Sequence, residues 1–211
     1  MRRRVLIVGG AVVAAAGIAG AVVLRRSEDA IAAGSWDPAI TPFDKVLGSA
    51  NAPVTIVEYA SFTCPHCATF HTDTWPTLKE RFVDSGQVRF VFRDFPLNEP
   101  ALRAGMMARC VPEDRYFSVV EVIFSTLDQW SNGDWRQGLG RIGRLAGLSQ
   151  EAFDACLADK ALEEQILGLR LAGQQLYDIN STPSFVINGK TFGGGRTIEQ
   201  FADIIEDASG A

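Results

Sequence analysis

Two runs of hydrophobic residues in the first half of the chain have the pattern of buried strands. Residues 54–59 are β-branched or apolar apart from one glutamate, as in a strand that is covered on both faces. A helical stretch follows and reaches about Asp84. Val88, Phe90 and Phe92 then occupy every second position, which is the period of a strand with at least one buried face. The pattern therefore predicts a β-α-β unit.

Helical periodicity takes over after this unit. Leu102, Met106 and Cys110 recur every fourth residue, which places them on one face of a helix. Four residues form the apolar face of a later helix: Leu162, Ile166, Leu169 and Leu176. A helical insertion at about 97–180 is therefore expected to interrupt the sheet.

Strand character returns near the C-terminus, at residues 184–187. Asn188 and Gly189 can adopt the positive φ angles of a tight hairpin that leads into a further strand. Thr197 and Gln200 have the spacing of a capping box, which predicts that a last helix begins there. The order of these elements indicates an α/β fold.

The N-terminal region has a different character. Residues 5–24 are 20 consecutive uncharged residues, half of them Gly or Ala, and arginines flank the run on both sides. At about 1.5 Å per residue, a helix of this length just spans a hydrocarbon core of roughly 30 Å. We therefore expect a signal or membrane-anchor segment at 1–26, a linker at 27–45 and a folded domain at 46–208. The sequence is compatible both with a signal that is cleaved and with a permanent membrane anchor, and either one implies export.

The charge of the chain argues against nucleic-acid binding. Five of the 20 basic residues lie in the first 26 positions, so 15 basic residues face 25 acidic ones in the remainder, a net charge of −10. A nucleic-acid interface needs a clustered basic face that neutralises phosphates. No nucleic-acid partner is therefore expected.

The main candidate for chemistry is the motif Cys64-Pro65-His66-Cys67, which follows the first strand and begins a helix. The unpaired N–H groups and partial positive charge of a helix N-terminus stabilise a thiolate on Cys64. Cys67 lies one turn further along and is expected to be more buried and less acidic. Pro65 suits the first helical turn, and His66 can add a positive charge or a donor beside the Cys64 sulfur.

This asymmetry is typical of thiol-disulfide exchange, with Cys64 as the nucleophile and Cys67 as its partner. A structural disulfide would not require the Pro-His dipeptide. Coordination of zinc by the two cysteines, His66 and His71 is disfavoured because the four side chains crowd on one part of a helix and no distant second pair exists. We therefore predict neither a metal nor another cofactor, although a copper- or zinc-binding module without turnover stays an alternative.

Phe62-Thr63-Cys64-Pro65-His66-Cys67 after Glu58 resembles the DsbA family of periplasmic disulfide oxidoreductases, and the similarity extends over 46–208. The resemblance implies a thioredoxin-like fold with a helical insertion. It implies that Glu58 is a buried acid under the active site that aids proton transfer at Cys67. It also implies that Thr182 and Pro183 form a cis-proline loop that binds the substrate peptide like an added strand.

The expected site therefore combines catalytic and substrate-binding residues. The catalytic residues are Cys64, Cys67, His66 and Glu58, and the substrate-binding residues are Pro65, Thr182 and Pro183. Two further cysteines, Cys110 and Cys156, fall on apolar faces of helices in the insertion. Export favours a structural disulfide between them, as in some relatives, and two separate buried thiols are the alternative.

The expected activity is a dithiol oxidase that introduces disulfides into exported polypeptides with free cysteines in the periplasm. The resemblance implies reoxidation by a DsbB-like, quinone-linked membrane protein. Thr182 stands where the most oxidising members of the family carry valine, so a reductase or isomerase role with a DsbD-like electron donor stays open. Residues 27–45 are too short for the dimerisation domain of dedicated isomerases, and a monomer is expected.

Overall fold

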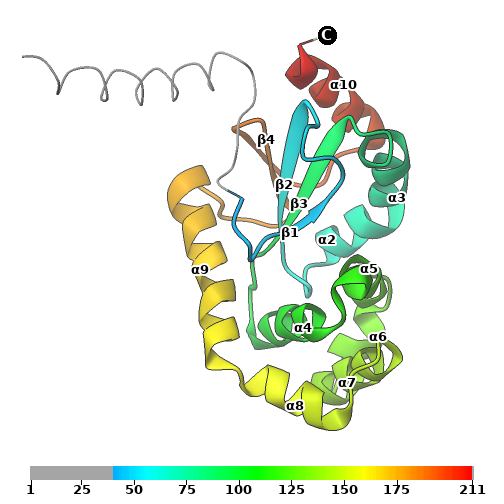
Figure 1. Cartoon of the computed structure of the whole chain (residues 1–211), viewed down its shortest axis with the longest axis vertical. Coiled ribbons are helices and arrows are strands. Elements are labelled where there is room, and N and C mark those ends of the chain that lie inside the picture. Colours follow the sequence, from blue (N-terminus) through cyan, green and yellow to red (C-terminus); the bar gives the residue numbers. More distant parts are fainter. Residues whose placement is uncertain (1–39, 211) are drawn as a thin grey trace, which may run out of the picture.

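The structure is a computed structural model that describes residues 40–210 (Figure 1). The expected signal or anchor segment at 1–26 and the linker as far as residue 39 lie outside the described residues. Between residues 40 and 210, no helix combines the length and the apolar character needed to cross a membrane.

A mixed five-stranded sheet forms the centre of the molecule, in the order β1-β3-β2-β4-β5. Its strands are β1 Lys45–Leu47, β2 Val54–Ala60, β3 Val88–Asp94, β4 Ser184–Ile187 and β5 Lys190–Gly193. β2 and β3 are parallel, with Ile56 opposite Phe90, whereas the other neighbouring pairs are antiparallel. Parallel neighbours need a crossover connection, which the helical segment between β2 and β3 supplies.

Helices make up most of the remaining described chain. The crossover consists of α2 Pro65–Thr69, the π-helical turn η1 Phe70–Thr74, α3 Trp75–Leu78 and a second π-helical turn, η2 Lys79–Val83. The insertion consists of α4 Glu99–Cys110, the 3-10 turn η3 Glu113–Arg115, α5 Tyr116–Ser125, α6 Leu127–Ser131, α7 Trp135–Leu145, α8 Gln150–Ala158 and α9 Lys160–Tyr177. The last helix is α10 Ile198–Ser209.

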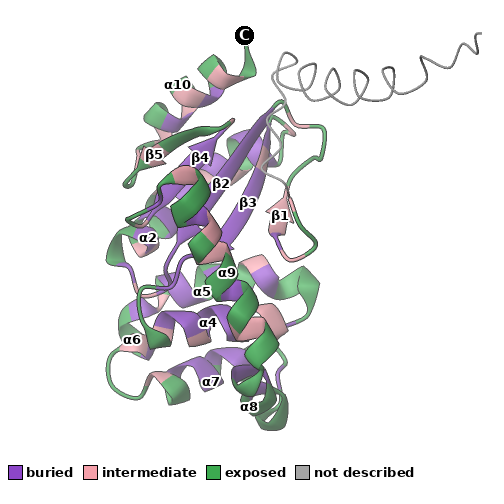
Figure 2. Ribbon diagram, turned by 90° about the vertical axis from the view of Figure 1, so that its left-hand side faces the viewer, coloured by how far each residue is buried: buried purple, intermediate pink, exposed green. Residues whose placement is uncertain are grey.

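Helices cover both faces of the sheet. α2, α3 and α10 lie on one face and α9 on the other, while α4 to α8 gather beyond the ends of β2 and β3 that lead into α2 and α4 (Figure 1). All seven residues of β2 are buried as a result, and β3 is nearly as well covered (Figure 2). This arrangement is the thioredoxin-like fold with a helical insertion that the family resemblance implies.

Several local predictions are confirmed. Asn188 and Gly189 connect β4 to β5 with φ angles of 41° and 87°. The Thr197 hydroxyl accepts from the Gln200 backbone N–H, and the Gln200 side chain accepts from the Thr197 backbone N–H, which completes the capping box of α10.

The sequence does not predict β1, which pairs antiparallel with β3. Three residues are too short to show a periodic pattern. A buried ion pair holds this strand in place, because the Asp44 carboxylate accepts from Arg93 Nε and Nη2 at 2.7 and 2.9 Å. Tyr59 accepts from the same guanidinium at 3.0 Å.

The prediction that Leu176 lies on the buried face of α9 is wrong, because its exposed fraction is 70%. Ile166 and Gly173 are the buried residues of this helix. At its end, the Tyr177 ring packs against Tyr59 with 6.3 Å between ring centroids. Tyr177 therefore occupies the inward position that we assigned to Leu176.

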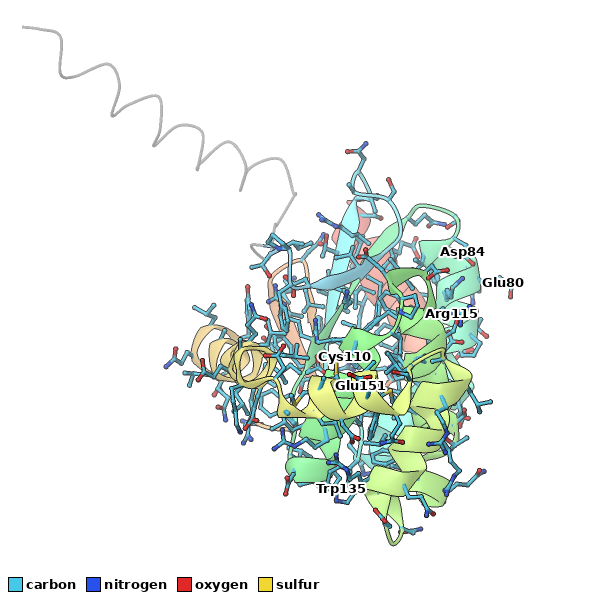
Figure 3. All side chains as sticks on the ribbon, turned by 60° about the horizontal axis from the view of Figure 1, so that its bottom comes forward. Glu80, Asp84, Cys110, Arg115, Trp135 and Glu151 are labelled. Atoms are coloured by element: carbon cyan, nitrogen blue, oxygen red, sulfur yellow. A yellow bond between two sulfur atoms is a disulfide. The ribbon has the colours of Figure 1, made fainter. Side chains whose placement is uncertain are left out.

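The end of α4 is linked covalently to α8 by a disulfide between Cys110 and Cys156 (Figure 3). The two cysteines are separated by 46 positions in the sequence. This disulfide lies in the helical insertion and is separate from Cys64 and Cys67, which are both free thiols.

Candidate active site

The chain turns sharply between the end of β2 and the start of α2, and this turn positions Cys64. The Cys64 backbone N–H donates to the Ser61 carbonyl at 3.0 Å. Cys64 has extended backbone angles, φ −88° and ψ 118°, and caps α2, while Pro65 occupies its first turn. Proline is favoured there because the first N–H groups of a helix have no partner within the helix. The Cys64 side chain therefore faces the unpaired N–H groups of α2.

The Cys64 thiol is unusually acidic, with a pKa lowered to about 5. Hydrogen bonding by the Cys67 thiol is the largest cause, and the Thr182 side chain and the backbone N–H groups of Cys67 and His66 add to it. Burial acts in the opposite direction and is outweighed. The site therefore stabilises the charged form of this sulfur.

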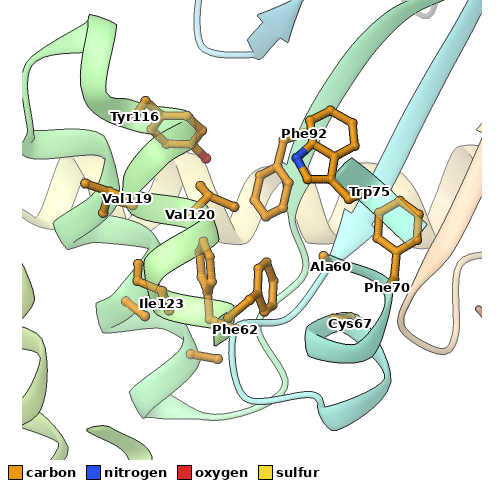
Figure 4. Close-up of a cluster of buried hydrophobic side chains, with 14 of the residues drawn as sticks. Ala60, Phe62, Cys67, Phe70, Trp75, Phe92, Tyr116, Val119, Val120 and Ile123 are labelled. Carbon is orange, nitrogen blue, oxygen red and sulfur yellow. The ribbon is translucent and has the colours of Figure 1, made fainter. Parts of the chain in front are cut away.

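Cys67 has the opposite character, since burial strongly raises the pKa of its thiol. Hydrogen bonding to Cys64 and the negative charge of Glu58 raise it further. The Cys67 side chain lies at the edge of a buried cluster that includes Phe62 and Phe70 (Figure 4). A thiolate on Cys67 is therefore short-lived unless a nearby group supplies a proton or the sulfur forms a bond.

Glu58 is fully buried on β2 and has a partner that sequence reasoning did not identify. His71 Nε2 lies 2.9 and 3.2 Å from the two carboxylate oxygens of Glu58. His71 belongs to η1, the π-helical turn. The available signal was the spacing of Cys67, His71 and Trp75, which places the three side chains on one face of a helix.

His66, by contrast, has an exposed side chain. Its backbone N–H stabilises the Cys64 thiolate. The imidazole instead lines a surface cleft of about 560 Å³ together with Asp73 and Arg196. His66 thus acts on Cys64 through its backbone N–H, whereas its side chain belongs to the neighbouring cleft.

The loop before β4 completes the site. The Thr182–Pro183 peptide bond is cis. The Cys64 thiol donates to the Thr182 carbonyl at 3.3 Å, although the two residues are 118 positions apart. The Thr182 hydroxyl is buried and has no hydrogen-bond partner among residues 40–210. It can therefore donate a hydrogen bond to a thiolate on Cys64, which lowers the pKa of that thiol. Pro65 is exposed on the first turn of α2, where it lines a cleft with Phe124 of α5 and Leu127 of α6.

The copper or zinc alternative finds no support. Across the described part of the chain, no three or more His, Cys, Asp or Glu side chains are grouped so that they could hold a metal ion. The site instead brings together an acidic thiol, a buried thiol and a buried carboxyl–imidazole pair. This arrangement is suited to sulfur exchange coupled to proton transfer.

Comparisons with known proteins agree with this chemistry. A family model described as thioredoxin matches residues 41–207. A Rickettsia typhi protein named "Putative protein-disulfide oxidoreductase RT0103" is 36% identical over 149 residues, which cover 69% of this chain and 55% of the relative. A Rickettsia bellii protein with a similar name is 33% identical over 148 residues, 69% of this chain and 57% of the relative. The chain thus spans little more than half the length of these relatives.

A solved structure is similar over a larger share of both chains. The crystal structure of Wolbachia pipientis alpha-DsbA1 has a TM-score of 0.74 and 32% sequence identity, and the match covers 81% of this chain and 93% of that one. The sheet, the crossover helix that carries the cysteines and the helical insertion all fall within the matched family range. On the fold, the site and these matches, the chain belongs to the thioredoxin family and, within it, to the DsbA-type proteins.

Proposed function

We propose that this protein is a thiol-disulfide oxidoreductase that works as a dithiol oxidase and introduces disulfides into exported polypeptides. The observation that carries the proposal is the difference between the two thiols, an acidic Cys64 and a buried Cys67 with a raised pKa. Each pKa unit of thiolate stabilisation corresponds to about 1.36 kcal/mol, or roughly 30 mV for a two-electron couple. A stabilised Cys64 thiolate favours the reduced protein and makes its disulfide a strong oxidant.

The reaction begins with the disulfide form. A substrate thiolate attacks the Cys64 sulfur, the bond to Cys67 breaks, and Cys67 leaves as a thiolate that takes a proton from Glu58. A second substrate thiolate then attacks the substrate sulfur bonded to Cys64. The Cys64 thiolate leaves, the substrate gains a disulfide, and two electrons have passed to the protein.

Substrate binding falls to the surface around Cys64. Thr182 and Pro183 present a backbone segment beside the thiol, and an extended peptide can add to such a segment through main-chain hydrogen bonds. Pro65 follows Cys64 in the sequence and contributes exposed surface on the other side of the thiol, toward α5 and α6. The partners are exported proteins with free cysteines and a DsbB-like membrane protein that reoxidises the dithiol. The protein acts in the periplasm as a monomer, either anchored or released by cleavage of the N-terminal segment.

The reduction potential of the Cys64–Cys67 pair tests this proposal. The protein is equilibrated in glutathione buffers, and the fraction of free thiol is measured by alkylation and mass spectrometry. We expect a potential above about −180 mV, the value of protein disulfide isomerase. A potential near about −270 mV, the value of thioredoxin, would instead support the reductase role.

A further inference from the structure

Glu58 and His71 form a buried pair of polar side chains that packs among aromatic rings. The exposed fractions of their side chains are 0% and 2%. The His71 ring stacks on Phe124 with 4.3 Å between centroids and lies 5.9 Å from the ring of Trp75. Burying two hydrogen-bonding groups among aromatic rings is costly unless they satisfy each other. Their direct hydrogen bond therefore fixes the position of the Glu58 carboxyl group, whose charge acts on the Cys67 thiol.

The second ring nitrogen of His71 is not satisfied in the same way. Nδ1 is buried and has no hydrogen-bond partner among residues 40–210. His71 also lines a surface cleft of about 530 Å³, which it shares with Glu121 and Ser125 of α5. His71 thus lies between the buried carboxyl group and this cleft, with Nε2 bonded to Glu58 and Nδ1 buried, so water reaches Nδ1 only when side chains that line the cleft move aside.

The proposed reaction requires a proton to travel to and from Cys67. When Cys67 leaves as a thiolate it must be protonated, and when it attacks a mixed disulfide it must lose that proton. The charge of Glu58 acts directly on this thiol. Glu58 is fully buried, so it needs a route by which its own proton is exchanged with water.

We propose that His71 is a positioning residue that exchanges the Glu58 proton with the cleft beside α5, and thereby controls the rate of the Cys67 step. Water that enters from the cleft protonates Nδ1, Nε2 passes its proton to the Glu58 carboxylate, and Glu58 protonates the Cys67 thiolate. When Cys67 attacks, each transfer runs backwards, and the imidazole returns to its starting tautomer. This inference rests on the proposed function.

Other charged and titratable groups surround the pair. Cys67 approaches from α2, and Glu121 lies on α5, where it accepts from Trp75 Nε1 at 3.0 Å. Tyr116, also on α5, stays neutral because burial holds its pKa well above the usual range. Charged groups also line the cleft: Lys79, Glu80 and Asp84.

The test measures the Cys67 step separately from the Cys64 step. Reduced protein is mixed with increasing oxidised glutathione between pH 4.5 and 8.5, quenched with acid and analysed by mass spectrometry. Formation of the mixed disulfide at Cys64 depends on glutathione concentration. Its resolution by Cys67 is intramolecular and sets the plateau rate.

The informative variant is His71→Gln. Glutamine can keep the N–H donor to Glu58, but it cannot take up and release a proton. Because positioned acid–base groups contribute about 10²–10⁴-fold, we expect the plateau rate at pH 7 to fall by at least tenfold, with a changed pH profile. The concentration-dependent Cys64 step should stay within about twofold.

Phe124→Leu is the matched control, because it removes the stacking partner of His71 and leaves the hydrogen bond to Glu58. It should keep the pH profile of the wild-type protein. An unchanged plateau rate in His71→Gln, or an equal loss in Phe124→Leu, overturns the proposal. Wild-type protein alone gives a further check, since the plateau rate should fall in D₂O and an identical rate would contradict a proton relay.

The two proposals fail in different ways. If wild-type protein forms no mixed disulfide and no Cys64–Cys67 disulfide, the proposed function is wrong. If the wild-type protein completes both steps and His71→Gln matches it at every pH, only the role of His71 is wrong.

Discussion

Two sulfur atoms one helical turn apart have opposite environments in this protein. Cys64 lies at the helix start, where backbone N–H groups of its own helix and the Thr182 side chain stabilise its thiolate. Cys67 is fully buried and senses the negative charge of Glu58. Separate roles for two chemically identical side chains therefore follow from where the helix begins.

The acidity of Cys64 should be visible in its reaction with iodoacetamide. With a pKa of about 5, the alkylation rate of reduced protein should rise between pH 4 and 6 and then level off. Below this range the thiolate is protonated and its stabilising contacts are lost. The rate is measured by mass spectrometry of the peptide that contains Cys64. A rise centred near the ordinary thiol value of about 8.5 would contradict the assigned environment.

At the scale of elements, the position of α9 on the sheet depends on one small residue. A Cβ atom at Gly173 would lie 2.6 Å from Cε1 of Tyr59, a buried residue of β2. α9 therefore packs against the sheet at a distance that only glycine permits.

Gly173→Ala should lower the free energy of unfolding by about 1–3 kcal/mol, because the extra methyl group displaces the Tyr59 ring or the helix. Gly168→Ala on the same helix is the control, since a Cβ there meets nothing within 4 Å. It should raise stability by up to about 1 kcal/mol through helix propensity. Urea unfolding of both variants measures the difference, and equal effects would show that contact with Tyr59 is unimportant.

Elements with a strong local signal are the ones that the sequence predicts. β2 and β3 are buried on both faces and are therefore rich in apolar residues, and the capping box marks the start of α10. β1 has no such signal, because Arg93, 49 positions away from Asp44, helps to hold it.

The candidate site divides in the same way. The cysteines are recognisable because their chemistry is tied to their place between a strand and a helix. The partnership of Glu58 and His71 is not, because it joins a strand to a helical turn, and the spacing that places His71 on one helical face with Cys67 does not say which strand residue it meets. His66 shows the converse, since proximity in sequence to Cys64 did not fix where its imidazole points.

For the whole molecule, the disulfide between Cys110 and Cys156 connects parts of the insertion that are distant in sequence. In the chain-entropy model, closing a loop of this length lowers the entropy of the unfolded chain and stabilises the folded state by roughly 4 kcal/mol. Replacing both cysteines with alanine should reduce the free energy of unfolding by about that amount, measured in urea without reductant. Exchange at Cys64 should persist. A change below about 1 kcal/mol would show that the unfolded chain gains little freedom without the bond.

The two edge strands of the sheet also limit pairing between the sheets of different molecules. β1 has three residues and β5 has four, and β5 carries Lys190 and ends at Gly193. Long, flat, apolar edge strands act as templates for β-aggregation, whereas short edges with lysine offer few unpaired backbone groups. The protein thus exposes few sheet-edge groups that could pair with another copy or with an unfolded polypeptide.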